Sequence, residues 1–347
     1  MSPTGNVSEV LIKTKASTSR ILIGESIENL GNYVSGRAIL LVDKNVQKLY
    51  KDFFKNYDRI LIEPGENSKS LDGLKNIYGQ LLEKGVDRSW FIIGVGGGVA
   101  TDIAGFVAST YMRGLRFGFV STTLLGQVDA SIGGKNGINF EGYKNIIGVF
   151  RQPEFVICDT EFLKTLPGKE LVNGFSEIIK YSLIADSELF DYLDSSYESI
   201  LALEPSSIHQ VIKRCVEIKA DIVMRDEKES FERRKLNFGH TIGHAIEKLS
   251  GISHGMAVSI GMVAALRISR AVSGLKKEDE ERAVSLLRKY GLPTDFSYGI
   301  DEIMGAIRKD KKKEVDSIYF VLLEELGKSV IRKMKFRDLK KVLDDLC

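Results

Sequence analysis

The sequence predicts an α/β first half built on a doubly wound parallel sheet, followed by a helical second half. Short apolar runs alternate with helix-favouring segments up to about residue 165, and strand-like runs then largely disappear. The change falls at a turn that contains Pro167 and Gly168. The 347 residues also exceed the size of one ordinary domain. We therefore expect a first domain over residues 1–165 and a second over residues 166–347.

Five apolar runs predict the strands of the first domain. They lie at residues 38–42, 59–62, 90–95, 117–121 and 155–158. Continuous apolar runs of this length are typical of strands buried on both faces, as in a parallel sheet. Helical segments at residues 71–84 and 99–112 separate some of them. This alternation predicts right-handed βαβ units.

Amphipathic segments predict the helices of the second domain. They lie at residues 169–184, 187–203, 207–226, 240–249, 256–273, 277–290 and 300–311. One apolar run near the end, residues 318–323, predicts a late strand or hairpin.

The balance of charge excludes some classes of partner. The chain has 49 basic and 47 acidic residues, a formal net charge of +2. Such a balance provides no electrostatic surface for nucleic acid or an anionic membrane, so we expect neither partner. From the polar start we expect no signal peptide, and we expect the apolar stretches to be too short to span a membrane. An anionic ligand must therefore be held by a local group of Lys and Arg side chains.

The cysteines indicate a reducing compartment. Cys158, Cys215 and Cys347 are widely separated, and their odd number argues against a disulfide framework. We expect a cytoplasmic protein.

A glycine-rich turn follows the strand expected at residues 90–95 and opens a helix. Backbone N–H groups and the helix dipole at such a turn favour a diphosphate. The match to the GxGxxG dinucleotide pattern is imperfect, because Val99 occupies the third glycine position and no acidic residue follows about 20 positions later. Asp43 and Glu66 precede the turn instead. A dinucleotide site and a plain tight turn both remain possible interpretations.

Three of the four histidines lie within fifteen positions. His240 and His244 share one helical face, and His254 follows a turn at Gly251. Two imidazoles with one carboxylate would suit a catalytic zinc ion, which keeps one position open for substrate or water. Thr241 rules out the HExxH pattern of a zinc protease. The alternative is that these are core histidines with ordinary hydrogen-bond partners.

Glu177 is the candidate third metal ligand. It lies among apolar neighbours in a predicted helix, where a carboxylate must find a partner or face solvent. Lys180 is one turn further on the same face, so a surface ion pair is an equally compatible interpretation.

A polar segment at residues 121–135 follows the strand expected at residues 117–121. In open α/β sheets, ligands bind at the carboxyl ends of strands. Lys135 lies at its end, and Lys144 and Asn145 follow in a second turn between Gly142 and Gly148. Lysines at such turns suit phosphate. The alternative is a long solvated loop with incidental charges.

Taken together, these segments closely resemble the 3-dehydroquinate synthases. The matching stretches are EPGENSKS (63–70), GGGVATDIAGFVASTYMRG (96–114), TTLLGQVDASIGGKNGIN (122–139), YKNIIGVFRQP (143–153), EIIK (177–180), RRKLNFGHTIGHAIE (233–247) and HGMAVSIGM (254–262). The resemblance runs from about residue 20 to about residue 325.

The resemblance implies a Rossmann-like NAD-binding α/β domain followed by an all-α metal-binding domain, with the active site in the cleft between them and a homodimeric assembly. The implied cofactors are NAD and a divalent metal, zinc or cobalt. The implied enzyme is a phosphate-eliminating lyase of the shikimate pathway of aromatic amino-acid biosynthesis. It converts 3-deoxy-D-arabino-heptulosonate 7-phosphate to 3-dehydroquinate through transient oxidation, phosphate elimination, reduction and an intramolecular aldol step.

The resemblance also implies a role for each motif residue. The metal ligands are Glu177, His240 and His254. The substrate residues are Asp129 and Lys180 at the hydroxyls, Lys135, Asn145, His244 and the other subunit's Arg113 at the phosphate, Lys219, Arg233 and Asn237 at the carboxylate, and Lys312 or its neighbour Lys311 as a further charge. The NAD residues are Asp43, Asn45, Glu66, Lys69, Gly97, Gly98, Asp102, Thr122, Thr123 and Lys144.

The chain departs from the family pattern at two places. Gly126 stands where alanine is more common, which we expect to be a small change, and the segment after Asp310 lacks a usual glycine. Two rival functions remain: a sister cyclase acting on a sugar phosphate without a carboxylate, and a glycerol-phosphate-type dehydrogenase of the same fold. Arg233 and Asn237 favour the carboxylate-bearing substrate over the first. The HTxGH helix argues against the second.

Overall fold

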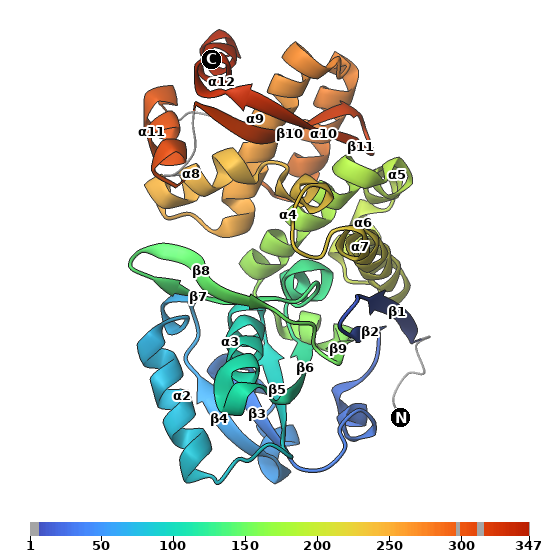
Figure 1. Cartoon of the computed structure of the whole chain (residues 1–347). Coiled ribbons are helices and arrows are strands. Elements are labelled where there is room, and N and C mark those ends of the chain that lie inside the picture. Colours follow the sequence, from blue (N-terminus) through green and yellow to red (C-terminus); the bar gives the residue numbers. More distant parts are fainter. Residues whose placement is uncertain (1–6, 296–298, 311–315, 347) are drawn as a thin grey trace. The chain divides into compact units, whose positions relative to one another are not determined.

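The computed structural model in Figure 1 describes residues 7–295, 299–310 and 316–346. The chain divides into two compact units. Unit 1 comprises Met1–Pro167 and Ile208–Lys228, and unit 2 comprises Gly168–Ser207 and Glu229–Cys347. The sequence predicted a single boundary near residue 165. The structure differs in one respect, because most of helix α7 (Pro205–Arg225) groups with the first unit.

Unit 1 is built on a seven-stranded sheet in the order β1-β2-β9-β6-β5-β3-β4. All neighbours are parallel except the antiparallel pair β1–β2. The strands are β1 (Ser8–Lys13), β2 (Thr18–Ile23), β3 (Ala38–Asp43), β4 (Asp58–Ile62), β5 (Phe91–Gly96), β6 (Arg116–Ser121) and β9 (Phe155–Cys158). The five predicted strands are confirmed, and β1 and β2 were missed. β1 has only a three-residue apolar run, residues 10–12, and every second position along it is exposed.

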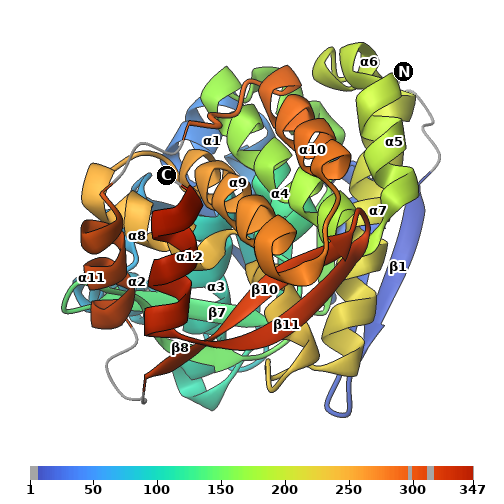
Figure 2. The same ribbon diagram turned by 90° about the horizontal axis from the view of Figure 1, so that it is seen from above.

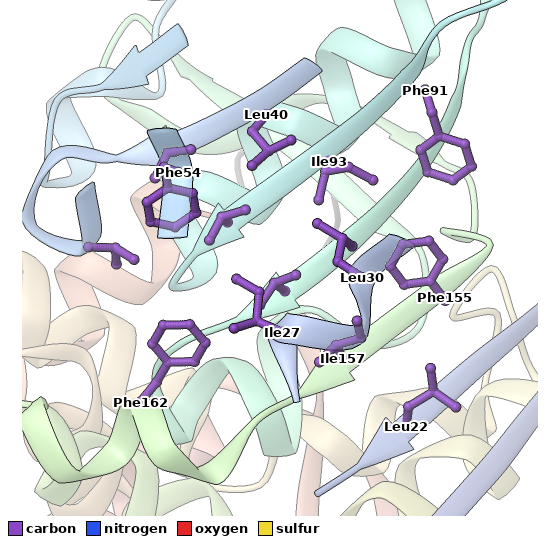
Figure 3. Packing of buried hydrophobic residues seen from close by; sticks show 14 residues of the cluster. Leu22, Ile27, Leu30, Leu40, Phe54, Phe91, Ile93, Phe155, Ile157 and Phe162 are labelled. Atoms are coloured by element: carbon purple, nitrogen blue, oxygen red, sulfur yellow. The ribbon is translucent and has the colours of Figure 1, made fainter. Parts of the chain in front are cut away.

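The helices α1 (Lys44–Leu49), α2 (Leu71–Glu83) and α3 (Gly98–Thr110) belong to the same unit. One part of the core packs Phe54, Phe91, Phe155 and Phe162 against aliphatic side chains of β3, β5 and β9 (Figure 3). Burial of these side chains is the dominant favourable term in holding the sheet together. The core thereby fixes the carboxyl ends of the strands, where the candidate NAD residues lie.

A separate hairpin in unit 1 corrects one prediction. Strands β7 (Lys135–Phe140) and β8 (Tyr143–Phe150) pair in antiparallel register. The segment from Gly142 to Gly148 is therefore mostly strand rather than a turn, and Lys144 and Asn145 lie on β8. Apolar and polar residues do not alternate regularly along β8. Its sequence therefore lacks the period-2 pattern by which a half-buried strand is predicted.

Unit 2 is mainly helical. Its helices are α4 (Gly168–Ala185), α5 (Ser187–Ser195), α6 (Tyr197–Leu201), α8 (His240–Ser250), α9 (His254–Ser273), α10 (Lys277–Lys289), α11 (Ile300–Asp310) and α12 (Phe336–Leu346). The helix expected over residues 187–203 is broken at Ser196, which leaves the helical conformation. The domain is not purely α-helical, because β10 (Ser317–Glu325) and β11 (Lys328–Lys335) form the late hairpin, visible in Figure 2.

Glycines let three helices of unit 2 approach closely. A Cβ on Gly255 of α9 would lie 2.5 Å from the Asn173 Cα of α4. A Cβ on Gly261 of α9 would lie 2.0 Å from the carbonyl oxygen of Gly239, just before α8. Only glycine fits such contacts without moving the backbone. Helices α4, α8 and α9 are therefore held at backbone-to-backbone distance.

Helix α9 is long and apolar enough to cross a membrane by length and composition, contrary to the expectation that every apolar stretch is too short. Within the unit, however, 72% of its apolar window is buried. A buried helix at the centre of a folded domain passes the same test, so this observation is weak evidence for a membrane span.

Candidate functional site

A group of three potential metal ligands lies where α4, α8 and α9 meet. Glu177 comes from α4, His240 begins α8 and His254 begins α9. The Glu177 Oε1 atom is 3.4 Å from His240 Nε2 and 3.6 Å from His254 Nε2. The ligand atoms of all three lie within 4.8 Å of one another. The close helix packing at Gly255 and Gly261 brings them together.

The two imidazoles are oriented as metal ligands usually are. The Nδ1 atom of His240 lies 3.0 Å from the carbonyl oxygen of Phe238, and the Nδ1 atom of His254 lies 3.3 Å from Glu247 Oε2. If each Nδ1–H donates to these acceptors, both Nε2 lone pairs point at the Glu177 carboxylate. Histidines that bind a metal usually turn their other ring nitrogen to a carboxylate or a backbone carbonyl, which is the arrangement of both rings here. The residues therefore fit a divalent metal with two nitrogen ligands and one oxygen ligand.

Burial and charge act differently on the two imidazoles. Burial lowers the pKa of His240 to about 3, in spite of the nearby Glu177 charge. Burial also disfavours protonation of His254, but hydrogen bonds and charges from Glu177 and Glu247 raise its pKa to about 9. A bound metal needs both rings neutral, so metal binding would release a proton from His254 near neutral pH.

Lys180 settles one alternative from the sequence. Its ammonium group pairs with Glu177, as expected, but the two side chains are only 2% and 0% exposed. The pair is therefore not a surface ion pair. His244, one turn after His240, is exposed, and its ring centre lies 5.3 Å from that of His240 and 5.8 Å from that of His254. The three histidines that are close in the sequence therefore also lie together in the structure.

Two further predicted residues of unit 2 lie in the short helical segment η7 (Glu232–Asn237). Arg233 is 2% exposed, which is rare for an arginine. The Asn237 side chain donates a hydrogen bond of 2.6 Å to Glu229 Oε1. Lys311 and Lys312 lie outside the described residues.

In unit 1, the glycine-rich turn lies at the topological switch point of the sheet. The chain runs from β3 outward to β4, then returns to β5 on the other side of β3 and continues to β6. Ligands of open α/β sheets bind at such a point, beyond the carboxyl ends of the strands. Asp43 ends β3 there, and a Cβ on Gly96 would lie 3.0 Å from the Asp43 Cβ. An acidic side chain thus lies beside the turn, on a strand that precedes it in the sequence.

The turn is shaped to receive a bulky anion. Helix α3 starts at Gly98, and its N-cap residue Gly97 has no side chain to cap the first N–H groups. A Cβ on Gly97 would lie 2.8 Å from Thr123 Cγ2, which brings Thr123 to the turn. The Thr122 N–H donates to the Gly96 carbonyl at 3.0 Å. The backbone N–H groups at the start of α3, with the side chain of Thr123 beside them, fit the diphosphate of NAD.

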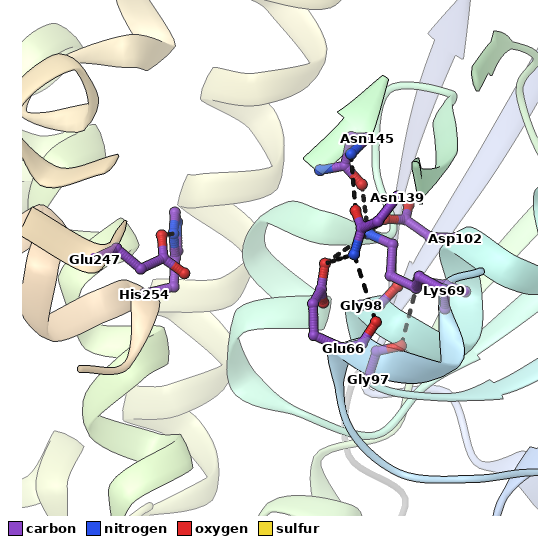
Figure 4. Close-up of polar contacts among 10 residues, drawn as sticks. Glu66, Lys69, Gly97, Gly98, Asp102, Asn139, Asn145, Glu247 and His254 are labelled. Atoms are coloured by element: carbon purple, nitrogen blue, oxygen red, sulfur yellow. Dashed lines mark hydrogen bonds and ion pairs between the residues drawn. The ribbon is translucent and has the colours of Figure 1, made fainter. Parts of the chain in front are cut away.

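A polar network joins the other predicted NAD residues (Figure 4). The buried Lys69 donates to Asp102 Oδ2 at 2.6 Å and to Asn145 Oδ1 at 2.5 Å, and it pairs with Glu66 at 3.5 Å. Asn139 donates to Glu66 Oε1 at 3.0 Å and accepts from the Asn145 N–H at 2.8 Å. Burial raises the pKa of Asp102 to about 6, although Lys69 opposes the rise. Residues predicted for NAD and for phosphate therefore share hydrogen bonds.

Asp129 and Lys219 form a second ion pair in unit 1, between a partly buried carboxylate and a buried ammonium group. The Lys219 ammonium lies 2.6 Å from Asp129 Oδ1 and 2.7 Å from the Asp129 carbonyl oxygen. Asp129 belongs to a π-helical turn, Gly126–Ala130 (η5). Such turns are frequent at functional sites. The sequence placed these residues at different ends of the substrate, and the structure brings them together.

The remaining predicted residues lie at the surface of unit 1. Asn45, Lys135, Lys144 and Arg113 are exposed. Arg113 and its neighbour Met112 both have positive φ angles, of 69° and 48°. Two consecutive residues in this strained conformation often mark a functional turn.

Sequence reasoning missed Glu247 and Asn139. Glu247 lies seven residues after His240 and three after His244, so it shares their helical face. That spacing was the available signal. Asn139 gave none, because its role depends on the pairing of β7 with β8.

Gly126 leaves room for two hydroxyl groups. A Cβ at this position would lie 2.3 Å from the buried Ser121 Oγ and 3.0 Å from Thr123 Oγ1. In this chain an alanine would require these side chains to move, and the size of the effect stays a prediction.

The fold and the two sites define a class: two-unit enzymes that join an NAD-type α/β unit to a helical metal-binding unit. The chain belongs to the 3-dehydroquinate synthase family. The family's N-terminal model matches residues 59–173, and its C-terminal model matches residues 174–313. The 3-dehydroquinate synthase of Alkaliphilus metalliredigens is 42% identical over 87% of this chain and 88% of its own length. That of Thermoanaerobacter pseudethanolicus is 42% identical over 92% and 94%.

Solved structures support the same class. A 2-deoxy-scyllo-inosose synthase complexed with carbaglucose-6-phosphate, NAD+ and Co2+ covers 97% of this chain and 100% of its own, with a TM-score of 0.85 and 25% identity. The 2-epi-5-epi-valiolone synthase of Streptomyces hygroscopicus subsp. jinggangensis 5008, with NAD+ and Zn2+ bound, covers 99% of both chains, with a TM-score of 0.86 and 26% identity. A glycerol dehydrogenase of Sinorhizobium meliloti, at 16% identity and a TM-score of 0.67, shares the fold alone.

Proposed function

We propose that the chain converts 3-deoxy-D-arabino-heptulosonate 7-phosphate to 3-dehydroquinate and phosphate, as a lyase of the shikimate pathway. The observation that carries the proposal is the cluster of the buried Glu177 with the partly buried His240 and His254, in the same unit as the buried Arg233. Arginine suits a carboxylate because its planar guanidinium can donate two parallel hydrogen bonds. The two relatives at 42% identity are both named 3-dehydroquinate synthase, the enzyme of this activity.

NAD would supply a transient hydride acceptor, and the metal would supply a Lewis acid at neighbouring hydroxyls. In unit 2, Glu177, His240 and His254 hold the metal. Lys180, whose ammonium is buried against Glu177, orients a substrate hydroxyl, and Arg233 and Asn237 bind the carboxylate end. Because the hydride returns to the substrate, no net oxidation occurs.

In unit 1 the proposed roles divide between cofactor and substrate. The cofactor contacts are Asp43, Asn45, Glu66, Lys69, Gly97, Gly98, Asp102, Thr122, Thr123 and Lys144. Asp129 and Lys219 bind substrate oxygens, and Lys135 and Asn145 bind phosphate together with His244. The carboxylate of Asp129 is already paired with Lys219, so their orientation is set before substrate arrives.

We further propose a cytoplasmic homodimer without nucleic-acid or membrane partners, in which one subunit's Arg113 serves the other subunit's phosphate site. The exposed Arg113 on its strained turn supports this role.

Two other functions remain as test outcomes. A sedoheptulose 7-phosphate cyclase would need no group for a carboxylate. A glycerol-phosphate-type dehydrogenase would need no phosphate-eliminating residues and would release NADH. The structural relatives with bound NAD+ are cyclases, which favours the first over the second.

The test measures phosphate release from 3-deoxy-D-arabino-heptulosonate 7-phosphate with NAD+ and zinc, while NADH absorbance and product mass are followed. Stoichiometric phosphate and 3-dehydroquinate without accumulating NADH would support the proposal, and His254→Ala should abolish both. Phosphate release from sedoheptulose 7-phosphate alone would replace it with the sister cyclase. Accumulating NADH with a polyol phosphate would replace it with the dehydrogenase.

A further inference from the structure

Glu247 lies beside the metal cluster but belongs to none of the roles above. It projects from α8 on the face of His240 and His244. Its side chain is 15% exposed, and its Oε2 atom lies 3.3 Å from His254 Nδ1 (Figure 4). The opposite nitrogen of the same ring, Nε2, is 3.6 Å from Glu177 Oε1. His254 is therefore held between two carboxylates from two different helices.

We propose that Glu247 is a positioning residue of the metal centre, which holds the His254 ring so that Nε2 faces the metal. The inference rests on the proposed metal site. A carboxylate that accepts the outer N–H of a ligand histidine fixes the ring, selects the tautomer and makes the ligand nitrogen more basic.

His254 needs this support more than the other two ligands. Glu177 is fully buried, and His240 is 13% exposed and oriented by the backbone carbonyl of Phe238. The His254 side chain is 33% exposed and stands on the first residue of α9, after the turn that joins α8 to α9. Its orientation depends on a side chain rather than on the backbone, so one substitution can remove it.

A competing arrangement would make Glu247 a direct ligand. His244, Glu247 and His254 also have ligand atoms within 4.8 Å of one another. A neutral imidazole has only one lone pair, so His254 can serve one of the two groups at a time. Glu177 is fully buried whereas His244 is exposed, and a buried carboxylate gains more from a cation than an exposed group does. Burial therefore favours Glu177 as the metal ligand and Glu247 as the residue that positions His254.

The test measures the affinity of the full chain for Zn2+ and Co2+ by competition with a chromophoric chelator, without NAD or substrate. Glu247→Ala should weaken both affinities by about 10- to 100-fold. Glu247→Gln keeps a hydrogen-bond acceptor without the charge, so its loss should be smaller. Glu281→Gln is the matched control. This carboxylate of the same unit is 63% exposed and paired with Lys277, so its substitution should leave the affinities for Zn2+ and Co2+ unchanged.

The visible spectrum of the Co2+ form provides a second readout, because it reports the ligand set. The spectrum of Glu247→Gln should keep the shape of the unsubstituted protein, and the melting temperature of the metal-free chain should change little. A purely structural role would lower that temperature and leave the affinity of the folded chain unchanged.

Three results would overturn the inference. The first is an unchanged metal affinity in Glu247→Ala and Glu247→Gln. The second is a Glu247→Gln chain that binds no metal while Glu177→Gln still binds it, because Glu247 would then be a ligand. The third is a chain that binds neither metal without any substitution, which would overturn the metal site of the proposed function as well.

Discussion

Substitution of Gly261 by alanine tests whether close helix packing positions the metal ligands. The new Cβ would lie 2.0 Å from the Gly239 carbonyl oxygen and 2.7 Å from the Gly243 N atom. The first distance is about 1.4 Å short of the 3.4 Å at which ordinary contact begins. Both neighbours are backbone, so they cannot rotate away. Helices α8 and α9 must separate by about 1 Å, and each carries one of the two histidines proposed as metal ligands.

The expected cost has two parts. Overpacking of this kind costs about 1–3 kcal/mol, offset by up to about 1 kcal/mol because alanine favours a helix over glycine. Ligand sets tolerate displacements of only about 0.5 Å. We therefore expect Gly261→Ala to lower the melting temperature of the metal-free chain and to weaken zinc binding by at least about 10-fold.

Circular dichroism melting and chelator competition measure the two effects separately. Gly305→Ala on α11 is the control, because a Cβ there meets nothing within 4 Å. It should raise stability by about 0.5–1 kcal/mol and leave zinc binding unchanged. Equal stability and equal zinc affinity in Gly261→Ala and the unsubstituted chain would show that the glycine contacts do not set the ligand positions.

The remaining predictions concern unit 1. Burial raises the pKa of Asp102 to about 6, so the ionised carboxylate lowers the free energy of unfolding above pH 6. This destabilisation should disappear as the pH falls toward 4, and a carbon-13 NMR titration of Asp102 with a midpoint below 4.5 would contradict the reasoning. Gly126→Ala should destabilise the chain by about 1–3 kcal/mol through contact with Ser121, and adding Ser121→Ala should restore most of the loss in thermal denaturation; equal melting temperatures for the two variants would refute it. Ellman's reagent should label at most one of the three thiols of the native chain, because Cys158 and Cys215 are fully buried; fast labelling of two would show that one is accessible.

Sequence patterns predicted most of the parallel sheet because its strands are continuous apolar runs. The same criterion was not applied to β1 and β2, although each contains three consecutive apolar residues, and it could not detect β8, where Ile146 and Phe150 are exposed. The π-helical turn at Asp129 has no distinctive composition. Its existence depends on tertiary contacts such as that with Lys219.

The histidines of the proposed metal site could be selected from the sequence because three histidines in fifteen positions are unusual in a chain with four. Their geometry was not, because it depends on which helices touch. The sequence left Glu177 between a metal ligand and a surface residue, and only its complete burial excludes the surface. Similarly, Asp43 could be assigned to the glycine turn only from the strand order, since β3 lies beside β5.

The division of the chain also affects its synthesis. Unit 1 is interrupted by residues 168–207, and Lys219 belongs to its second segment. A ribosome therefore completes the whole seven-stranded sheet well before it makes the lysine that neutralises Asp129. Until then the nascent unit holds Asp129 of its π-helical turn without the ion pair to Lys219. For the same reason, a fragment that ends at Pro167 is not an independent version of this unit, and a version expressed by itself should include residues 208–228 on a new connection.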